Sequence, residues 1–191
     1  MDKPERKSAR LHLVLIAVVF FGPLVAAAWL YYGGYFSGPT ETTNHGALLE
    51  PIVNLRDALP DSGIHPHNEG HWLLVYADPL ECGPECRNAL YTTRQSRTML
   101  GKEMDRLARV FLHGDSPPDT VFIAEEHPGL ITIEDASLNG LLQNKRPGEL
   151  PAGGYYLIDP LGNLVLYFRP DINPAEMVDD IKHLLRLSRI G

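Results

Sequence analysis

The hydrophobic pattern of the chain consists of one long apolar stretch followed by an alternation of short strands and helices. Residues 11–32 contain no Asp, Glu, Lys or Arg, and these 22 residues are long enough to cross a membrane as a helix. Beyond residue 70, short apolar runs rich in β-branched and aromatic residues predict strands, and apolar residues spaced three and four apart predict helices. The predicted strands are 71–77, 109–113, 130–133, 155–158 and 163–168. The predicted helices are 82–107, 137–144 and one that begins at Pro174, whereas 121–125 is ambiguous.

The order of these elements is βα, βα, ββα, which is typical of an α/β domain. Asp159-Pro160-Leu161-Gly162 supplies turn residues between the last two strands and therefore predicts a β-hairpin. Residues 33–70 include Gly33-Gly34, and we interpret them as a linker and lead-in segment before a folded domain over 71–191. Apolar residues between 47 and 59 could lay part of this segment against the domain.

The charges that flank the apolar stretch predict its orientation in a membrane. Residues 1–10 carry a net charge of +2, with Lys3, Arg6, Lys7 and Arg10 against two acidic residues. Because Lys and Arg stay on the cytoplasmic side, we expect a cytoplasmic basic tail over 1–10 and a single-pass transmembrane anchor over 11–32. The C-terminal domain would then lie in the periplasm, held at a bacterial inner membrane. Ala26-Ala27-Ala28 could instead end a cleavable signal peptide, so cleavage stays open.

The remainder of the chain is acidic. It carries a net charge of −9, against −7 for the whole protein, and it contains no cluster of Lys and Arg. We therefore expect no nucleic-acid partner. No Ser-His-Asp order, glycine-rich phosphate loop or paired-carboxylate motif indicates a hydrolase or a kinase.

The only two cysteines, Cys82 and Cys86, stand where the first predicted helix follows a buried strand. A helix N-terminus favours the thiolate, which attacks disulfides and binds soft metals, and residues four apart on a helix lie within disulfide distance. A structural disulfide is the alternative, but a bridge that closes so small a loop would add little stability. Asp78, Glu81 and Glu85 place negative charge beside the thiols. This negative charge opposes thiolate formation.

Histidines supply the other candidate ligands. His113 ends a predicted strand at the sheet edge where the cysteines lie, so it could be a metal ligand or an acid–base partner, or an ordinary surface residue. His65, His67 and His71 have a spacing that could bind a metal. Pro66 and Asn68 stand among them, and we favour a solvated loop there.

The order of elements, the cysteine pair after the first major strand and the late hairpin followed by a helix together resemble the thioredoxin fold. Within that fold, the four-residue cysteine spacing, the hairpin over 156–162 and the single N-terminal anchor resemble the Sco/SenC family across residues 46–187. The resemblance implies an α/β thioredoxin-like domain with an N-terminal transmembrane helix, and Cys82 and Cys86 as the paired thiols. It also implies assembly of the copper site of cytochrome c oxidase, with an oxidase subunit or another respiratory assembly factor as the partner.

One position departs from that family. The family's copper site takes two cysteines and a histidine shortly before the hairpin, where this chain has Pro151, and no histidine lies between His127 and His183. Two thiolates bind Cu(I) but should hold Cu(II) poorly, so we expect copper as an optional ligand and no required cofactor. Other thioredoxin-like oxidoreductases place a cis-proline there, facing the cysteines. Pro151 is therefore a candidate for the partner-binding surface, with an ordinary loop proline as the alternative.

Three functional hypotheses follow. The protein could be a membrane-tethered thiol-disulfide oxidoreductase that supports maturation of the oxidase copper site through Cys82 and Cys86. It could be a copper chaperone that uses the same pair with a non-standard third ligand, for which His113 is the candidate. It could also be a non-catalytic interaction module with a structural disulfide. We favour the first hypothesis because both thiols are present and the expected histidine is not.

The topology prediction can be tested by proteolysis. If residues 11–32 form an uncleaved anchor with the N-terminus inside, protease added to spheroplasts should digest the chain beyond residue 40. Protection of that region, or a mature N-terminus near Trp29, would contradict the anchored topology.

Overall fold

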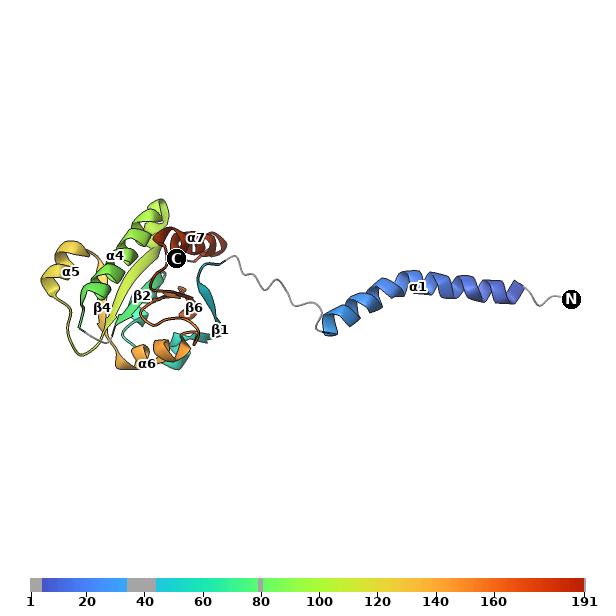
Figure 1. Ribbon diagram of the computed structural model, residues 1–191, viewed down its shortest axis with the longest axis horizontal. Helices are drawn as coiled ribbons and strands as arrows, with labels where there is room; N and C mark the ends of the chain where they lie inside the picture. Colours follow the sequence, from blue (N-terminus) through green and yellow to red (C-terminus); the bar gives the residue numbers. More distant parts are fainter. Residues whose placement is uncertain (1–4, 34–43, 79–80, 191) are drawn as a thin grey trace. The chain divides into compact units, whose positions relative to one another are not determined.

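The computed structural model describes residues 5–33, 44–78 and 81–190. The chain forms two compact units, Met1–Thr43 and Asn44–Gly191 (Figure 1). Of the predicted linker and lead-in segment over 33–70, residues 34–43 lie outside the described residues.

The described residues of the first unit form one long helix, α1, over Glu5–Tyr32. Its segment Leu11–Leu30 is long and apolar enough to cross a membrane, although a signal sequence would meet the same criteria. The large apolar side chains of this segment are exposed rather than packed into a core, as expected for a helix that lipid covers. Pro23 lies inside the helix and does not end it.

The second unit is built on a six-stranded sheet with the order β1-β6-β5-β2-β3-β4. The strands are β1 Ala47–Asn54, β2 Trp72–Asp78, β3 Leu107–His113, β4 Leu130–Glu134, β5 Tyr155–Ile158 and β6 Asn163–Phe168. The helices are α2 Leu55–Ala58, α3 His65–Asn68, α4 Pro84–Met99, α5 Thr120–Glu126, α6 Ala136–Lys145 and α7 Pro174–Leu187, with a 3₁₀ turn η1 at Gly101–Arg106. Strands β2, β3 and β4 are parallel, whereas β5, β6 and β1 pair antiparallel to their neighbours.

Helices cover both faces of this sheet (Figure 1). On one face α4 and α7 pack over Leu74, Tyr76 and Phe111, and on the other α6 packs over Leu73 and Val75. Strand β2 is therefore buried on both sides, which explains why its sequence is a continuous apolar run rather than an alternating one. The carboxyl end of this central strand is where the cysteine motif begins.

The structure confirms the α/β class, the strands and the hairpin, corrects the extent of one helix and resolves one ambiguous segment. The helix predicted to run from Cys82 to Leu107 is shorter, because Gly101 adopts a φ of 61° after Met99 and the chain continues as η1. Residues Thr120–Glu126, which were ambiguous in the sequence, form α5.

The lead-in segment is part of the sheet. Strand β1 pairs antiparallel with β6, from Ala47 opposite Tyr167 to Asn54 opposite Asn163. The second compact unit, Asn44–Gly191, therefore includes β1 of the lead-in segment together with the predicted domain over 71–191. The pairing joins segments far apart in the sequence, so no local pattern predicts it.

The loop ahead of β5 contains Gly154, a glycine at a position with no room for a larger side chain. A Cβ on Gly154 would overlap the carbonyl oxygen of Phe168 and lie 2.6 Å from Tyr167 Oη. The amide of Gly154 donates to Tyr167 Oη at 3.1 Å, and this hydroxyl donates to the carbonyl of Pro151. Burial raises the pKa of Tyr167, which keeps its proton available for that bond.

We expect Gly154→Ala to destabilise the domain by about 2 kcal/mol or more, because the added methyl group must displace backbone. Thermal unfolding of the full chain in detergent would measure the loss as a lower midpoint temperature. Gly140→Ala is the matched control, since nothing lies within 4 Å of a Cβ at this helical position. Equal midpoints for the two variants would contradict the packing described here.

Candidate functional site

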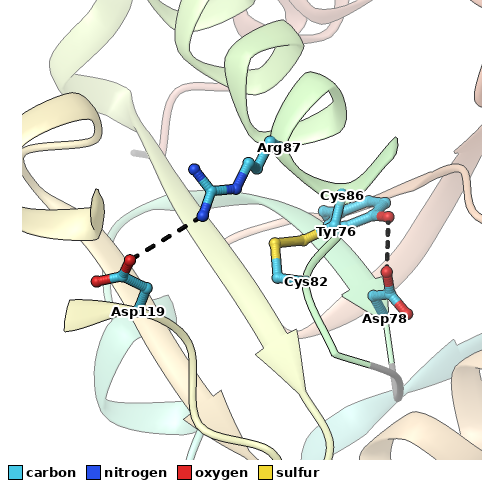
Figure 2. Close-up of a disulfide and its surroundings, with 6 residues drawn as sticks. All are labelled: Tyr76, Asp78, Cys82, Cys86, Arg87 and Asp119. Carbon is cyan, nitrogen blue, oxygen red and sulfur yellow. Dashed lines mark hydrogen bonds and ion pairs between the residues drawn. A yellow bond between two sulfur atoms is a disulfide. The ribbon is translucent and has the colours of Figure 1, made fainter. Parts of the chain in front are cut away.

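The cysteines lie where the central strand passes into the first long helix. Strand β2 ends at Asp78, Gly83 caps α4, and Pro84 is its first residue. Cys82 therefore precedes the helix and Cys86 lies in its first turn, whereas the sequence had placed both on the helix. A disulfide joins them, with their Cα atoms 5.1 Å apart (Figure 2).

The two sulfur-bearing residues differ in accessibility. Cys86 is 1% exposed and belongs to the core that packs α4 against the sheet, together with Ala89 and Leu90. Cys82 is only partly buried at the margin of the same core. A partner thiol can therefore approach Cys82, while Cys86 is shielded by the fold.

A tyrosine and a carboxylate of β2 lie in the surroundings of the disulfide (Figure 2). Tyr76 Oη donates to Asp78 Oδ2 at 3.2 Å (Figure 2). Burial, followed by the charge and hydrogen bond of Asp78, raises the pKa of Tyr76, so its hydroxyl remains a donor. Glu81 and Glu85 are exposed, so water moderates the negative charge that the sequence placed near the thiols.

A positive side chain that the sequence analysis did not single out lies beside the disulfide. Arg87 follows Cys86 on α4, and one guanidinium nitrogen lies 4.0 Å from Asp119 Oδ2 (Figure 2). The same guanidinium stacks over the ring of Phe122, with its central carbon 4.3 Å from the ring centre. The contact of Arg87 with Asp119 joins distant parts of the chain, so the sequence pattern does not predict it.

The loop that carries Pro151 borders a cavity beside the start of α4. Ala152 and Gly153 of this loop line the cavity of about 450 Å³ together with Glu85 and Asn88 of α4. Pro151 itself is exposed. The cis isomer left open for Pro151 is wrong, because the cis bond within residues 5–33, 44–78 and 81–190 joins Glu50 and Pro51. Its role at the partner-binding surface stays a prediction.

His113 occupies the sheet edge that the sequence predicted. It lies opposite Asp78 in the parallel register of β2 and β3, and its Nδ1 donates to the carbonyl of Gly114 at 2.7 Å. That bond leaves Nε2 as the nitrogen able to accept a proton or a metal. However, the described part of the chain contains no group of three or more His, Cys, Asp or Glu placed to hold a metal ion. The geometry therefore does not bring His113 and the cysteines together as a three-ligand site.

The earlier histidine cluster makes local backbone contacts. His65 Nε2 lies 2.7 Å from the carbonyl of Leu59, and His71 Nδ1 lies 2.9 Å from the carbonyl of Glu69. The predicted solvated loop is wrong for part of this segment, because residues His65–Asn68 form the short helix α3, Asn68 is 1% exposed and His65 is partly buried, whereas His67 and His71 are exposed.

Comparison with solved structures shows a shared fold. Apo Sco1 of Thermus thermophilus has a TM-score of 0.53 at 17% identity, over 77% of this chain and 99% of that chain. Yeast Sco1 with copper bound has a TM-score of 0.51 at 16% identity, over 65% and 81% of the two chains. Arabidopsis thaliana ScoI with copper bound has a TM-score of 0.50 at 18% identity, over 65% and 89%. At these identities the likeness is one of fold, and it confirms the thioredoxin-like class.

Sequence comparison identifies the domain. No curated protein matches the chain. Residues 72–188, which include the cysteine motif and every strand from β2 to β6, match one family. The chain therefore belongs to the family of transmembrane-like, thioredoxin-like C-terminal domains.

Proposed function

We propose that this protein is a membrane-anchored thiol-disulfide exchange factor of the bacterial periplasm that acts through Cys82 and Cys86. The observation that carries the proposal is the unequal exposure of the two sulfur-bearing residues, with Cys86 in the core and Cys82 at its margin. Thiol-disulfide exchange needs one accessible sulfur for the partner and one protected sulfur to resolve the mixed disulfide. A structural bridge needs no such inequality.

The exchange can be written for a protein that keeps its partner reduced. The Cys82 thiolate attacks a disulfide sulfur of the partner, which forms a mixed disulfide and releases one partner thiolate. Cys86 then loses its proton and attacks Cys82 Sγ, which releases the second partner thiolate and restores the Cys82–Cys86 disulfide. Two electrons pass to the partner, and a dithiol donor must return them to the pair.

The proposed partner is a respiratory assembly substrate, specifically the cysteines of the copper site in cytochrome c oxidase. Support comes from the Sco/SenC resemblance in the cysteine spacing and hairpin, and from the fold shared with Sco1 and ScoI structures. The helix over Leu11–Leu30 is compatible with an anchor that would hold the domain near a membrane-bound oxidase.

We expect the disulfide to be reversible, with a reduction potential above the roughly −300 mV below which structural bridges lie. Graded dithiol buffers and alkylation of the full chain in detergent would measure the potential. In the reduced protein, Cys82 should be alkylated about tenfold faster than Cys86 because it is the accessible thiol. A bridge that resists reduction until the domain unfolds would contradict the proposal and favour the structural hypothesis.

Copper binding by the same pair is a second candidate function, because yeast Sco1 and Arabidopsis thaliana ScoI share this fold and hold copper. Reduced Cys82 and Cys86 offer two thiolates, which suit Cu(I). Cu(II) needs harder donors in addition, and Pro151 offers none at the position where the resembling family has its histidine.

We expect the wild-type protein to bind Cu(I) but to lose Cu(II) on buffer exchange. Pro151→His should raise Cu(II) retention, by roughly tenfold in affinity, since an imidazole would join the two sulfurs. Copper content and the absorption of the copper–thiolate bond would be measured after dialysis. His113→Ala is the control and should change neither quantity. If the wild-type protein retains one Cu(II) per chain and the His113→Ala variant loses it, this account is overturned and the chaperone hypothesis is favoured.

A further inference from the structure

We propose that Arg109, together with Arg94 and Arg97, forms a binding site for a small oxyanion, an ion or ligand group of the phosphate or carboxylate type. The site lies where α4, the first half of β3 and the turn after α5 meet. The cysteines lie at the carboxyl edge of the sheet instead, so the inference goes beyond the proposed exchange function and does not depend on it.

Arg109 is a buried positive charge whose donors are not all used. Its residue is 3% exposed, and Nη2 donates to the carbonyl of Pro128 at 2.9 Å. Nε and Nη1 are buried and have no hydrogen-bond partner within the described residues. Across the same ranges of the chain, no acidic side chain forms an ion pair with Arg109. Because an unpaired buried charge is costly, these donors point to a partner that the domain itself does not supply.

Two further guanidinium groups converge on the same corner of the domain. Arg94 Nη1 donates to the carbonyl of Glu126 at 2.7 Å, and Arg97 Nε donates to the carbonyl of Leu107 at 2.9 Å. Leu107 begins β3, two residues before Arg109, and Glu126 ends α5 directly ahead of the turn that Arg109 bonds. Helix α4 therefore brings two exposed or partly exposed cations to the buried one.

The three cations repel one another. Burial, followed by the positive charges of Arg97 and Arg94, lowers the pKa of Arg109 to about 10, so Arg109 is still charged at neutral pH. Asp105 lies 3.3 Å from Arg97 and Glu126 lies 3.7 Å from Arg94, but both carboxylates are largely exposed and offset little of this repulsion. An oxyanion among the three groups would relieve the repulsion and accept the hydrogen bonds that Arg109 can still donate.

The turn after α5 limits the size of the ligand. His127 is 2% exposed, and its Nδ1 has no partner in the part of the chain that the structure describes. Burial, then the charges of Arg109 and Arg94, lowers the pKa of His127, so a neutral imidazole offers a hydrogen bond without adding charge. A cavity of about 230 Å³ adjoins this turn and is lined by His127, Pro128 and Thr132 among others. Such a space suits a single phosphate or carboxylate group.

The test is thermal unfolding of the full-length protein in detergent, titrated with sodium phosphate while sodium chloride holds the ionic strength constant. The midpoint temperature of the wild type should rise with phosphate and then saturate, because a ligand that binds only the native state stabilises it. Sodium acetate is the second arm. A response to phosphate alone assigns a tetrahedral oxyanion, and a response to acetate assigns a carboxylate as a ligand.

Three variants locate the site. Arg109→Met should be at least as stable as the wild type without phosphate, because an apolar side chain replaces an unpaired buried charge, and it should lose the response to phosphate. Arg94→Gln and Arg97→Gln should each weaken the apparent affinity about threefold, the size expected for an exposed charge pair. If Arg109→Met does not fold, the double variant of Arg94 and Arg97 replaces it and should bind about tenfold more weakly.

Arg87→Gln is the matched control. Arg87 is also an exposed arginine of α4 that faces an acidic residue near α5, Asp119, at 4.0 Å. It lies about two helical turns before Arg94, away from the corner that contains Arg109. Its loss should leave the apparent affinity for phosphate unchanged.

The proposal is overturned if neither phosphate nor acetate raises the midpoint more than chloride does at the same ionic strength. It is also overturned if Arg109→Met, or the double variant in its place, keeps the wild-type response, because binding would then be adventitious. An equal loss of affinity in Arg87→Gln and Arg94→Gln would show a general effect of charge and would likewise count against the site. None of these measurements involves the reduction potential of the disulfide, so this inference and the exchange function fail separately.

Discussion

The packing of α4 against the central strand β2 is the contact on which the site depends. Cys86 is one of the side chains that make this contact, with Ala89 and Leu90 on the same helix face and Leu74 and Tyr76 on the strand. Because the core holds Cys86, the position of its sulfur is set by the fold and not by the loop before the helix. Cys82 is drawn to the margin of the core through the bridge, and the difference in accessibility follows from this one packing arrangement.

The same arrangement determines which charges surround the thiols. Strand β2 ends with Asp78, whose carboxylate accepts a hydrogen bond from the hydroxyl of the buried Tyr76. Part of the negative charge of Asp78 is therefore stabilised by a hydrogen bond within the domain. The acidic residues of the motif itself face water. The start of α4 then contributes a helix N-terminus and Arg87, both positive. Charges of both signs therefore surround the cysteines, and the partly exposed setting lets water weaken each of them.

Local patterns in the sequence predicted the parts of this site that depend on neighbouring residues. Each of these local predictions depends on a few consecutive residues: the apolar run of β2, the cysteines after it and the Asp159–Gly162 turn. The structure confirms the elements that they predict. The end of α4 was missed because the conformation of Gly101 interrupts an otherwise helical stretch. The pairing of β1 with β6 and the contact of Arg87 with Asp119 join distant segments, so neither can be derived from periodicity.

At Pro151, the fold determines the position of the loop, but it does not determine the chemistry of the side chain on that loop. The loop that bears it is tied to β6 by Tyr167, which bonds both Pro151 and Gly154, so the fold holds the loop in a defined place beside the cavity at the start of α4. Pro151 offers no imidazole donor on this loop, and the described part of the chain places no group of three or more His, Cys, Asp or Glu so that it could hold a metal ion. Two sulfur donors alone suit Cu(I) better than Cu(II), because Cu(II) prefers harder donors in addition.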